Sequence, residues 1–225
     1  MGLNDSDYQA LWLTFRLAGL TTTILFLLGT PLAWALARGR GAWRGPVGAV
    51  VALPLVLPPS VLGFYLLLAM GPAGLIGKTL TFLHLDPIAF TFPGLVFASV
   101  LYSMPFMVQP LQAAFEDLGN GPLEAAATLR ASPLERFFTV AVPLSRTGFF
   151  TAGVMAFTHT VGEFGVVLMI GGNRPGETKV ASVAIYDHVD ALEYTQAHRM
   201  SGLLLAFSFV VLLAMYRWRR RGRQA

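Results

Sequence analysis

Residues 11–37 read LWLTFRLAGLTTTILFLLGTPLAWALA, an apolar run with one charged side chain, Arg16. A bilayer's hydrocarbon core is about 30 Å thick, and about 20 helical residues cross it. The run is therefore long enough to span a membrane, and Arg16 lies near its beginning, where a long side chain can reach the interface. The preceding residues carry acids but no base, unlike the start of a secretory signal. We expect residues 11–37 to be a retained transmembrane helix.

Four further apolar runs have the length of membrane spans. The whole sequence is 55% hydrophobic and only 12% charged, too little polar surface for a water-soluble globule. It contains no cysteine, which excludes disulfides and thiolate metal sites. We predict an all-α polytopic bundle forming one transmembrane domain, 1–225, with five clear spans and a sixth possible. Besides the first run, the predicted spans are residues 47–70, 88–114, 147–170 and 200–218.

The distribution of Lys and Arg predicts the orientation. These residues collect on cytoplasmic loops, because moving them across the membrane is unfavourable. With the amino terminus outside, four fall in outer segments: Lys78, Arg174, Lys179 and Arg199. Eleven fall in inner segments: Arg38, Arg40, Arg44, Arg130, Arg136, Arg146, Arg217, Arg219, Arg220, Arg221 and Arg223. We predict an inner-membrane protein with its amino terminus outside and its carboxyl terminus in the cytoplasm. Since anchoring accounts for the basic residues, the net charge of +4 indicates no nucleic-acid partner.

The largest inner segment, residues 115–146, contains signals for two short helices. Pro122 suits the first turn of one helix, and an Ala-rich stretch follows it. Ser132 and Glu135 stand in the order of a capping box, with Pro133 at the first position of a second helix. Such a compact pair of helices, at about residues 119–145, predicts a rigid projection that a soluble partner could grip.

Residues 124–143 resemble the Glu-Ala-Ala loop of ABC importer permeases. The residues in register with the family pattern are Glu124, Ala125, Ala126, Val140, Val142 and Pro143, but Arg130 stands where the family has Gly. Gly there would favour a turn with positive φ. The alternative for Glu124 is a plain cap on a surface helix. The resemblance implies that the ATPase-coupling residues are Glu124, Ala125, Ala126, Ala127, Leu129, Arg130, Ala131, Ser132, Pro133 and Pro143.

A second polar cluster lies late in the fourth predicted span. Residues 157–165, with the rest of the stretch from about 119 to 213, resemble molybdate permeases and, to a lesser degree, sulfate permeases. An ionised carboxylate is costly in hydrocarbon and needs a donor, which His159 could supply one turn before Glu163. A fixed negative charge would repel an oxyanion, so we interpret the cluster as structural or gate-holding and expect no metal there. Its residues are His159, Gly162, Glu163 and Phe164.

Small residues recur every fourth position along the same span, at Gly148, Ala152 and Ala156. Such a stripe permits close helix approach. It fits either an intramolecular contact or a seam between two copies of the chain.

Two sequence patterns in the predicted outer segments do not indicate a nucleotide site or a metal site. Gly77-Lys78-Thr79 ends like a phosphate-binding loop, but Pro72 stands where the pattern needs Gly. Asp187, His188 and Asp190 are most simply solvated outer residues rather than metal ligands.

The resemblance implies a permease subunit of an ATP-driven molybdate importer. It would have no enzymatic activity or cofactor of its own, since ATP-Mg would bind a separate ATPase. Its expected partners are a second copy of itself, two ATPase subunits, an extracytoplasmic oxyanion-binding protein and membrane lipid. The alternatives are a sulfate or tungstate permease, and an intramembrane enzyme or channel using Glu163 and His159.

Overall fold

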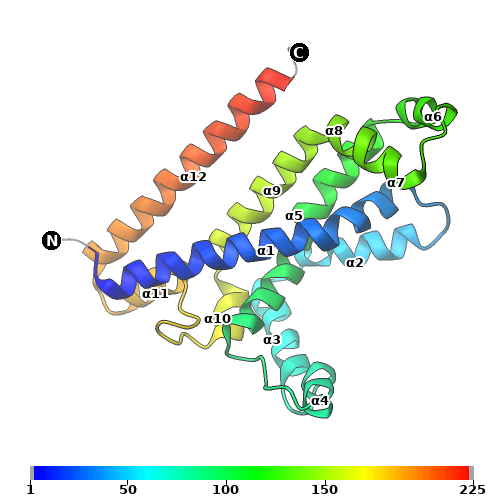
Figure 1. Cartoon of the computed structure of the whole chain (residues 1–225). Helices are drawn as coiled ribbons and strands as arrows, with labels where there is room; N and C mark the ends of the chain where they lie inside the picture. Colours follow the sequence, from blue (N-terminus) through cyan, green and yellow to red (C-terminus); the bar gives the residue numbers. More distant parts are fainter. Residues whose placement is uncertain (1–2, 223–225) are drawn as a thin grey trace.

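The computed structural model describes residues 3–222, which form helices joined by short loops, with no strand in that range (Figure 1). Arg223 and the side chains of Arg219, Arg220 and Arg221, which the charge count includes, lie outside this description. The elements are α1 (Asp5–Arg38), α2 (Arg44–Val56), α3 (Pro59–Met70), α4 (Leu75–Phe82), α5 (Phe92–Asp117), α6 (Gly121–Thr128), α7 (Pro133–Arg136), the π-helix η1 (Phe137–Ala141), α8 (Val142–Leu144), α9 (Arg146–Val161), α10 (Gly165–Gly171), α11 (Ala181–Asp190) and α12 (Tyr194–Gly222).

The prediction of an all-α membrane bundle is confirmed. Four helical stretches are long and apolar enough to cross a membrane: Asp5–Arg38, Pro59–Phe82, Phe92–Asp117 and Tyr194–Trp218. A fifth crossing is possible through the bent pair Pro133–Leu144 and Arg146–Val161, whose axes differ by 74°. The count reaches the five predicted spans when this bent pair is taken as one crossing, and the second long stretch is Pro59–Phe82 rather than residues 47–70.

The second predicted span, residues 47–70, is not one continuous helix. It breaks between α2 and α3, where Leu57 and Pro58 have extended backbone with ψ of 134° and 137°. A residue that precedes proline is pushed out of the helical region, and here two successive prolines, Pro58 and Pro59, act on two successive residues. The sequence therefore contained the signal for this break.

The fourth predicted span, residues 147–170, is also broken. α9 ends at Val161 and α10 begins at Gly165, with Phe164 at φ −124° and ψ −60° between them. A Cβ atom on Gly165 would lie 2.7 Å from Cβ of Pro59, so this glycine lets α10 approach the start of α3. The packing of α10 on α3 at this break joins residues far apart in the sequence, so spacing along one helix does not reveal it.

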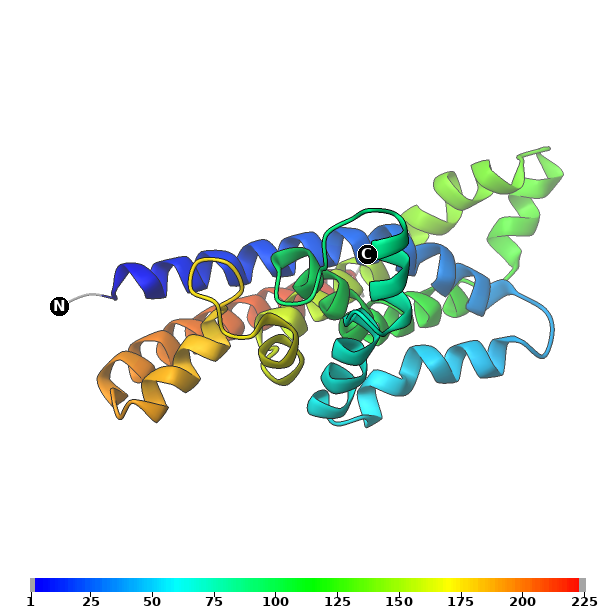
Figure 2. The same cartoon turned by 90° about the horizontal axis from the view of Figure 1, so that it is seen from below.

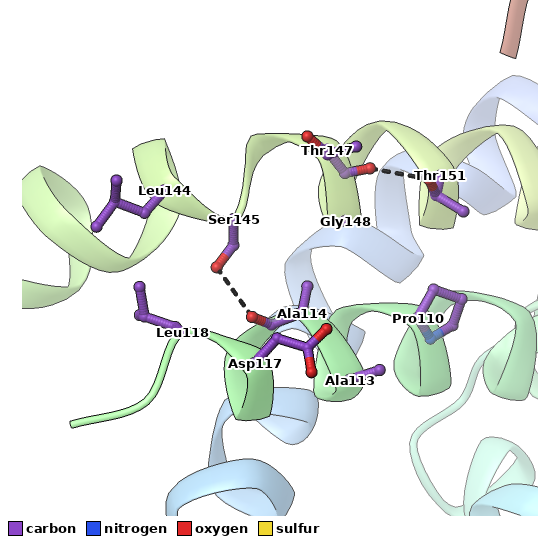
Figure 3. A pocket seen from close by; sticks show the side chains of 10 residues that line it. All are labelled: Pro110, Ala113, Ala114, Asp117, Leu118, Leu144, Ser145, Thr147, Gly148 and Thr151. Carbon is purple, nitrogen blue, oxygen red and sulfur yellow. Dashed lines mark hydrogen bonds between the residues drawn. The ribbon is translucent and has the colours of Figure 1, made fainter. Parts of the chain in front are cut away.

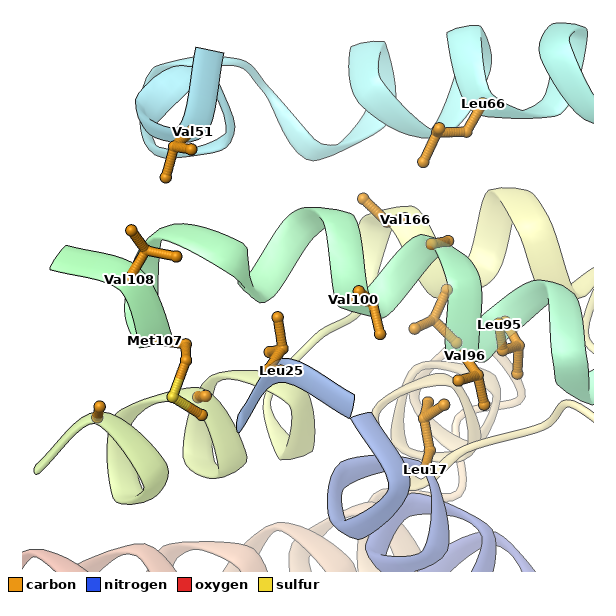
Figure 4. Packing of buried hydrophobic residues seen from close by; sticks show 14 of the residues in the cluster. Leu17, Leu25, Val51, Leu66, Leu95, Val96, Val100, Met107, Val108 and Val166 are labelled. Carbon is orange, nitrogen blue, oxygen red and sulfur yellow. The ribbon is translucent and has the colours of Figure 1, made fainter. Parts of the chain in front are cut away.

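α5 forms the centre of the bundle and α12 its edge. In the most apolar stretch of each helix, 61% of the residues are buried for α5 and 11% for α12. Figure 4 shows Val100, Met107 and Val108 of α5 packed among side chains of the neighbouring helices, including Leu25 of α1 and Val51 of α2. One continuous cluster of buried residues links α1, α2, α3, α5, α9, α10 and α11.

The small-residue stripe of α9 forms an intramolecular seam with α5. Ala152 and Ala156 are fully buried. A Cβ atom on Gly148 would lie 2.3 Å from Cβ of Ala114, so only glycine fits against α5 at this point. Of the two interpretations open at the sequence level, the structure supports the contact within the chain.

The segment from α6 to α8 projects from one end of the bundle (Figure 2). The two helices predicted there are present as α6 and α7, and Pro143 lies in the first turn of α8. Between α7 and α8 the chain forms the π-helix η1, in which the N–H of Val142 bonds the carbonyl of Phe137. The same end of the bundle carries the α1–α2 connection, and α4, α10 and α11 lie toward the other end (Figure 1).

Candidate functional site: a projecting helix pair and a buried polar network

The projecting helix α6 presents an open surface. Of its eight residues, all within the described part of the chain, none is buried. Glu124 lies in the first turn, where the helix dipole favours a carboxylate. Glu124, Ala125 and Ala127 are exposed, and Leu129 at the helix end is 83% exposed. The helix therefore leaves a carboxylate and a large apolar side chain accessible to a partner.

The turn after α6 keeps the geometry expected of the family's glycine although Arg130 occupies the position. Arg130 has φ of 62°, in the left-handed region. Its N–H bonds the carbonyl of Ala127, and the N–H of Ala131 bonds the carbonyl of Ala126. These two bonds form the Schellman pattern that ends many helices. The hydrogen bonds thus hold an arginine in a conformation that costs a side-chain-bearing residue about 1–2 kcal/mol.

The start of α7 is capped as predicted. The hydroxyl of Ser132 accepts the N–H of Glu135 at 3.3 Å, and the N–H of Ser132 donates to Oε2 of Glu135 at 2.7 Å. The backbone bond from Ser132, together with its hydroxyl, holds the pKa of Glu135 below the ordinary value. Pro133 occupies the first turn, and Leu134 after it is 69% exposed. Leu134 lines an apolar groove together with Leu27 and Trp34 of α1, and sequence reasoning missed it.

A cleft lies where the projection meets the bundle (Figure 3). It measures about 380 Å³ and lies between the end of α5 and the α8–α9 bend. The hydroxyl of Ser145, at the bend, donates to the carbonyl of Ala114 at 3.5 Å. Asp117 and Thr151 are also among the side chains lining the cleft. A change in the 74° bend would alter this cleft directly.

A buried polar network joins α5 to the broken helix. Ser99 donates to Oε2 of Glu163 at 2.9 Å. One turn further along α5, Ser103 bonds Nδ1 of His159 and Oγ1 of Thr160, both at 2.9 Å. The prediction that His159 serves as the donor to Glu163 is wrong. The helix ends at Val161, so the two side chains are not successive on one face and each pairs with a serine of α5.

Glu163 itself is 4% exposed, and its Oε1 has no hydrogen-bond partner among the described residues. Its backbone carbonyl accepts the hydroxyl of Ser182 from α11 at 2.6 Å. His159 lies against the ring of Phe106, with centroids 3.8 Å apart, and close to Tyr102 at 4.8 Å.

The residues at the break between α9 and α10 line a cavity of about 550 Å³. Its lining consists of Pro59, Ser60, Tyr102, Thr158, His159, Gly162, Glu163, Phe164 and Gly165. Irregular backbone at membrane depth occurs where it is buried in protein or lines a water-filled cavity. This arrangement can therefore admit a polar group or water between the helices.

The outer residues that sequence reasoning took as solvated are mostly paired. Asp187 forms an ion pair with Lys179 at 2.5 Å and accepts two bonds from Asn173. Asp190 is exposed, as expected. Within residues 3–222, no group of three or more His, Asp or Glu residues could hold a metal.

His188 of α11 links the start of α1 to the loop before α12. Its Nε2 lies 2.8 Å from Oδ1 of Asp7, which is 1% exposed at the start of α1, and its Nδ1 lies 2.8 Å from Glu193. Burial lowers the pKa of His188, but the hydrogen bonds and charges of Asp7 and Glu193 outweigh it and raise that pKa above the ordinary value. This cluster ties α11 to the first turn of α1.

Gly77, Lys78 and Thr79 lie inside the helix α4. A phosphate-binding loop instead wraps its ligand before a helix begins, so the rejection of this pattern agrees with the structure.

Comparison with known proteins adds the family. Residues 29–220 match the binding-protein-dependent transport system inner membrane component. The chain is 60% identical to the molybdenum transport system permease protein ModB of Azotobacter vinelandii, over 98% of this chain and 97% of the relative. It is 31% identical to the sulfate transport system permease protein CysT of Synechocystis, over 96% of this chain and 75% of the relative.

A likeness to a solved structure supports the fold. A chain in the crystal structure of a bacterial alginate ABC transporter, in complex with an alginate pentasaccharide-bound periplasmic protein, aligns with a TM-score of 0.77. The alignment covers 97% of this chain and 80% of that chain, at 18% identity.

Proposed function

Because the chain belongs to the family of inner membrane components of binding-protein-dependent transport systems, we propose that it is the permease subunit of an ATP-driven molybdate importer. The observation that supports this proposal is the 60% identity to a molybdenum permease over 98% of the chain, compared with 31% identity to a sulfate permease. The protein is a multi-pass inner-membrane protein and a transport subunit. Molybdate is therefore favoured over sulfate as its substrate.

The projection formed by α6 and α7 is proposed as the docking surface for a separate ATPase, which would bind ATP-Mg. Three observations support this role: no residue of α6 is buried, Glu124 stands in its first turn, and Leu129 and Leu134, which follow the helix, are exposed. The excess of Lys and Arg on the same side of the membrane supports a cytoplasmic location, with the amino terminus outside. Two ATPases would act on two copies of this chain.

The buried network around Glu163 is proposed to hold the broken helix α9–α10 against α5 on the translocation pathway. Ser99 bonds Glu163 directly, and Ser103 bonds His159, so separating these helices would break both contacts. A binding protein would deliver the oxyanion at the opposite end from α6. ATP-driven closure of the ATPases shifts the equilibrium between inward-facing and outward-facing states if the ATPases bind these states with different affinities.

The test is uptake of labelled molybdate into proteoliposomes containing the permease, its ATPase and its binding protein. We expect uptake that requires ATP and resists excess sulfate; competition by tungstate measures selectivity between the two closely related oxyanions. Glu124→Ala should reduce ATPase binding and uptake. The matched control is Glu177→Ala, an exposed carboxylate outside the helix pair.

Two outcomes would contradict the proposal. One is wild-type uptake that continues without ATP, as a channel would allow. The other is covalent turnover by the isolated subunit that Glu163→Gln abolishes, as an intramembrane enzyme would require.

A further inference from the structure

Arg38, the last residue of α1, makes three hydrogen bonds to a distant part of the chain. Its Nη1 donates to Oδ1 of Asn120 at 2.6 Å, and its Nη2 donates to the carbonyls of Phe115 and Gly119, both at 2.7 Å. The guanidinium also lies 5.5 Å from the ring centroid of Trp34, within cation–π range. These acceptors lie at the end of α5 and at the start of α6.

The local structure explains why an arginine suits this place. The last carbonyls of a helix lack partners within the helix and carry partial negative charge, which favours a cation at the end of α5. Gly119, at φ of 65°, turns the chain between α5 and α6. A planar guanidinium can serve several acceptors from one fixed fork, whereas a lysine ammonium is a compact point charge.

The attachment of α6 to the bundle is otherwise sparse. None of its residues, all of them described, is buried, and its end leads through the Arg130 turn to α7. On the other side of the projection, Phe137 of η1 packs on Trp34 of α1, with ring centroids 5.0 Å apart, and Trp34 packs on Phe115 at 5.1 Å. Arg38 and this ring contact together connect both ends of the helix pair to α1 and α5.

We propose that Arg38 is a positioning residue that makes α1 and the inner end of α5 move together with α6 when the docking surface is displaced. The proposal rests on the function proposed above, since it needs an ATPase acting on α6. Through Arg38, a pull on α6 would reach α1 directly as well as through the loop that follows α5. This positioning role differs from that of an arginine that only anchors the protein in the membrane through its positive charge, for which Arg40 is the comparison. Arg40, two residues later, is exposed and makes no hydrogen bond or ion pair with any described residue.

The experiment measures uptake of labelled molybdate and ATP hydrolysis in the same proteoliposomes, using the complete complex. The variants are Arg38→Ala, Arg38→Lys, Asn120→Ala, the double variant Arg38→Ala/Asn120→Ala, and Arg40→Ala as the charge-matched control. We expect Arg38→Ala to keep ATP hydrolysis but lower uptake per ATP by about tenfold or more, since it removes three charge-assisted bonds. Arg38→Lys should be intermediate, Asn120→Ala milder, and the double variant no worse than Arg38→Ala.

A distance measurement separates positioning from a merely structural role. Since the chain contains no cysteine, spin labels can be attached at Leu27→Cys on α1 and Thr128→Cys on α6 without background from this chain. With Arg38 present, the distance between the labels should be the same with and without ATP. In Arg38→Ala it should change when ATP binds, because α6 moves without α1.

Unchanged uptake per ATP in Arg38→Ala would overturn the proposal, as would an equal loss in Arg40→Ala or label distances that respond to ATP in the same way with and without Arg38. If Arg38→Ala fails to assemble, Asn120→Ala decides between the outcomes, because it removes one bond at an exposed partner. Failure of the proposed function has a different signature, namely no ATP-dependent uptake by the wild-type complex.

Discussion

The contact between Gly148 of α9 and Ala114 of α5 allows a quantitative test of the bundle's packing. In Gly148→Ala the new Cβ would lie 2.3 Å from Cβ of Ala114, more than 1 Å inside the ordinary contact distance of 3.4–4 Å. A Cβ atom cannot swing away as the end of a long side chain can. The helices would have to separate along a seam that includes the fully buried Ala152 and Ala156.

The expected loss of stability follows from two opposing effects. Overpacking a close contact costs about 1–3 kcal/mol, and this severe overlap points to the upper part of that range. Replacing a helical glycine with alanine stabilises the helix by about 0.5–1 kcal/mol. We therefore expect a net loss of about 1–2 kcal/mol, which lowers Tm by roughly 2–8 °C for a chain of this size.

The assay is thermal unfolding of the purified protein in detergent, with Gly202→Ala as control. Gly202 lies in α12 with nothing within 4 Å of its Cβ position, so its replacement should leave Tm unchanged or slightly raised. Adding Ala114→Gly to Gly148→Ala should recover much of the loss. The reasoning fails if Gly148→Ala is as stable as Gly202→Ala, or if Ala114→Gly gives no recovery.

Three further predictions concern single contacts. Arg130→Gly should stabilise the end of α6 by about 0.5–1 kcal/mol, since relief of about 1–2 kcal/mol of left-handed strain exceeds the entropic cost of glycine, and slower amide exchange in α6 would reveal it. The bond of His188 to Asp7 should stabilise the protein fully below the ordinary histidine pKa of about 6.5 and weaken as pH rises through the raised pKa of His188. As pH rises above about 6.5, Tm should therefore fall more in wild type than in His188→Gln. Ser99→Ala should cost about 1–3 kcal/mol in thermal unfolding, because it removes the hydrogen-bond partner of the buried Glu163 carboxyl; equal stability of the variant would contradict this account.

The features that sequence predicted well are those set by local physical chemistry. Span length and polarity located the apolar helices, because a membrane imposes both. The Ser132 and Glu135 pair was recognisable because a capping box depends on residues three apart. The turn at Arg130 was expected from a glycine position in the family pattern, and the structure keeps the left-handed conformation without the glycine.

The features that sequence reasoning missed depend on contacts between distant residues. The pairing of Glu163 with Ser99 joins positions 64 apart, and no spacing rule within one helix predicts it. Gly165, after the break in the fourth predicted span, packs on Pro59, which is distant in the sequence. The break at Leu57 had a local signal, the adjacent prolines, which the apolar character of the run concealed.

The π-helix at Phe137–Ala141 holds one more residue in its turn than an α-helix would. Each residue of an α-helix turns the chain by about 100°. Removing one residue here, such as Thr139, would let the turn become α-helical and would swing α7 and its exposed Leu134 to another azimuth about the axis of α8. The direction in which Leu134 faces is therefore set by a single surplus residue, and a one-residue deletion would turn α7 relative to the bundle while leaving α1, α5 and α12 unchanged.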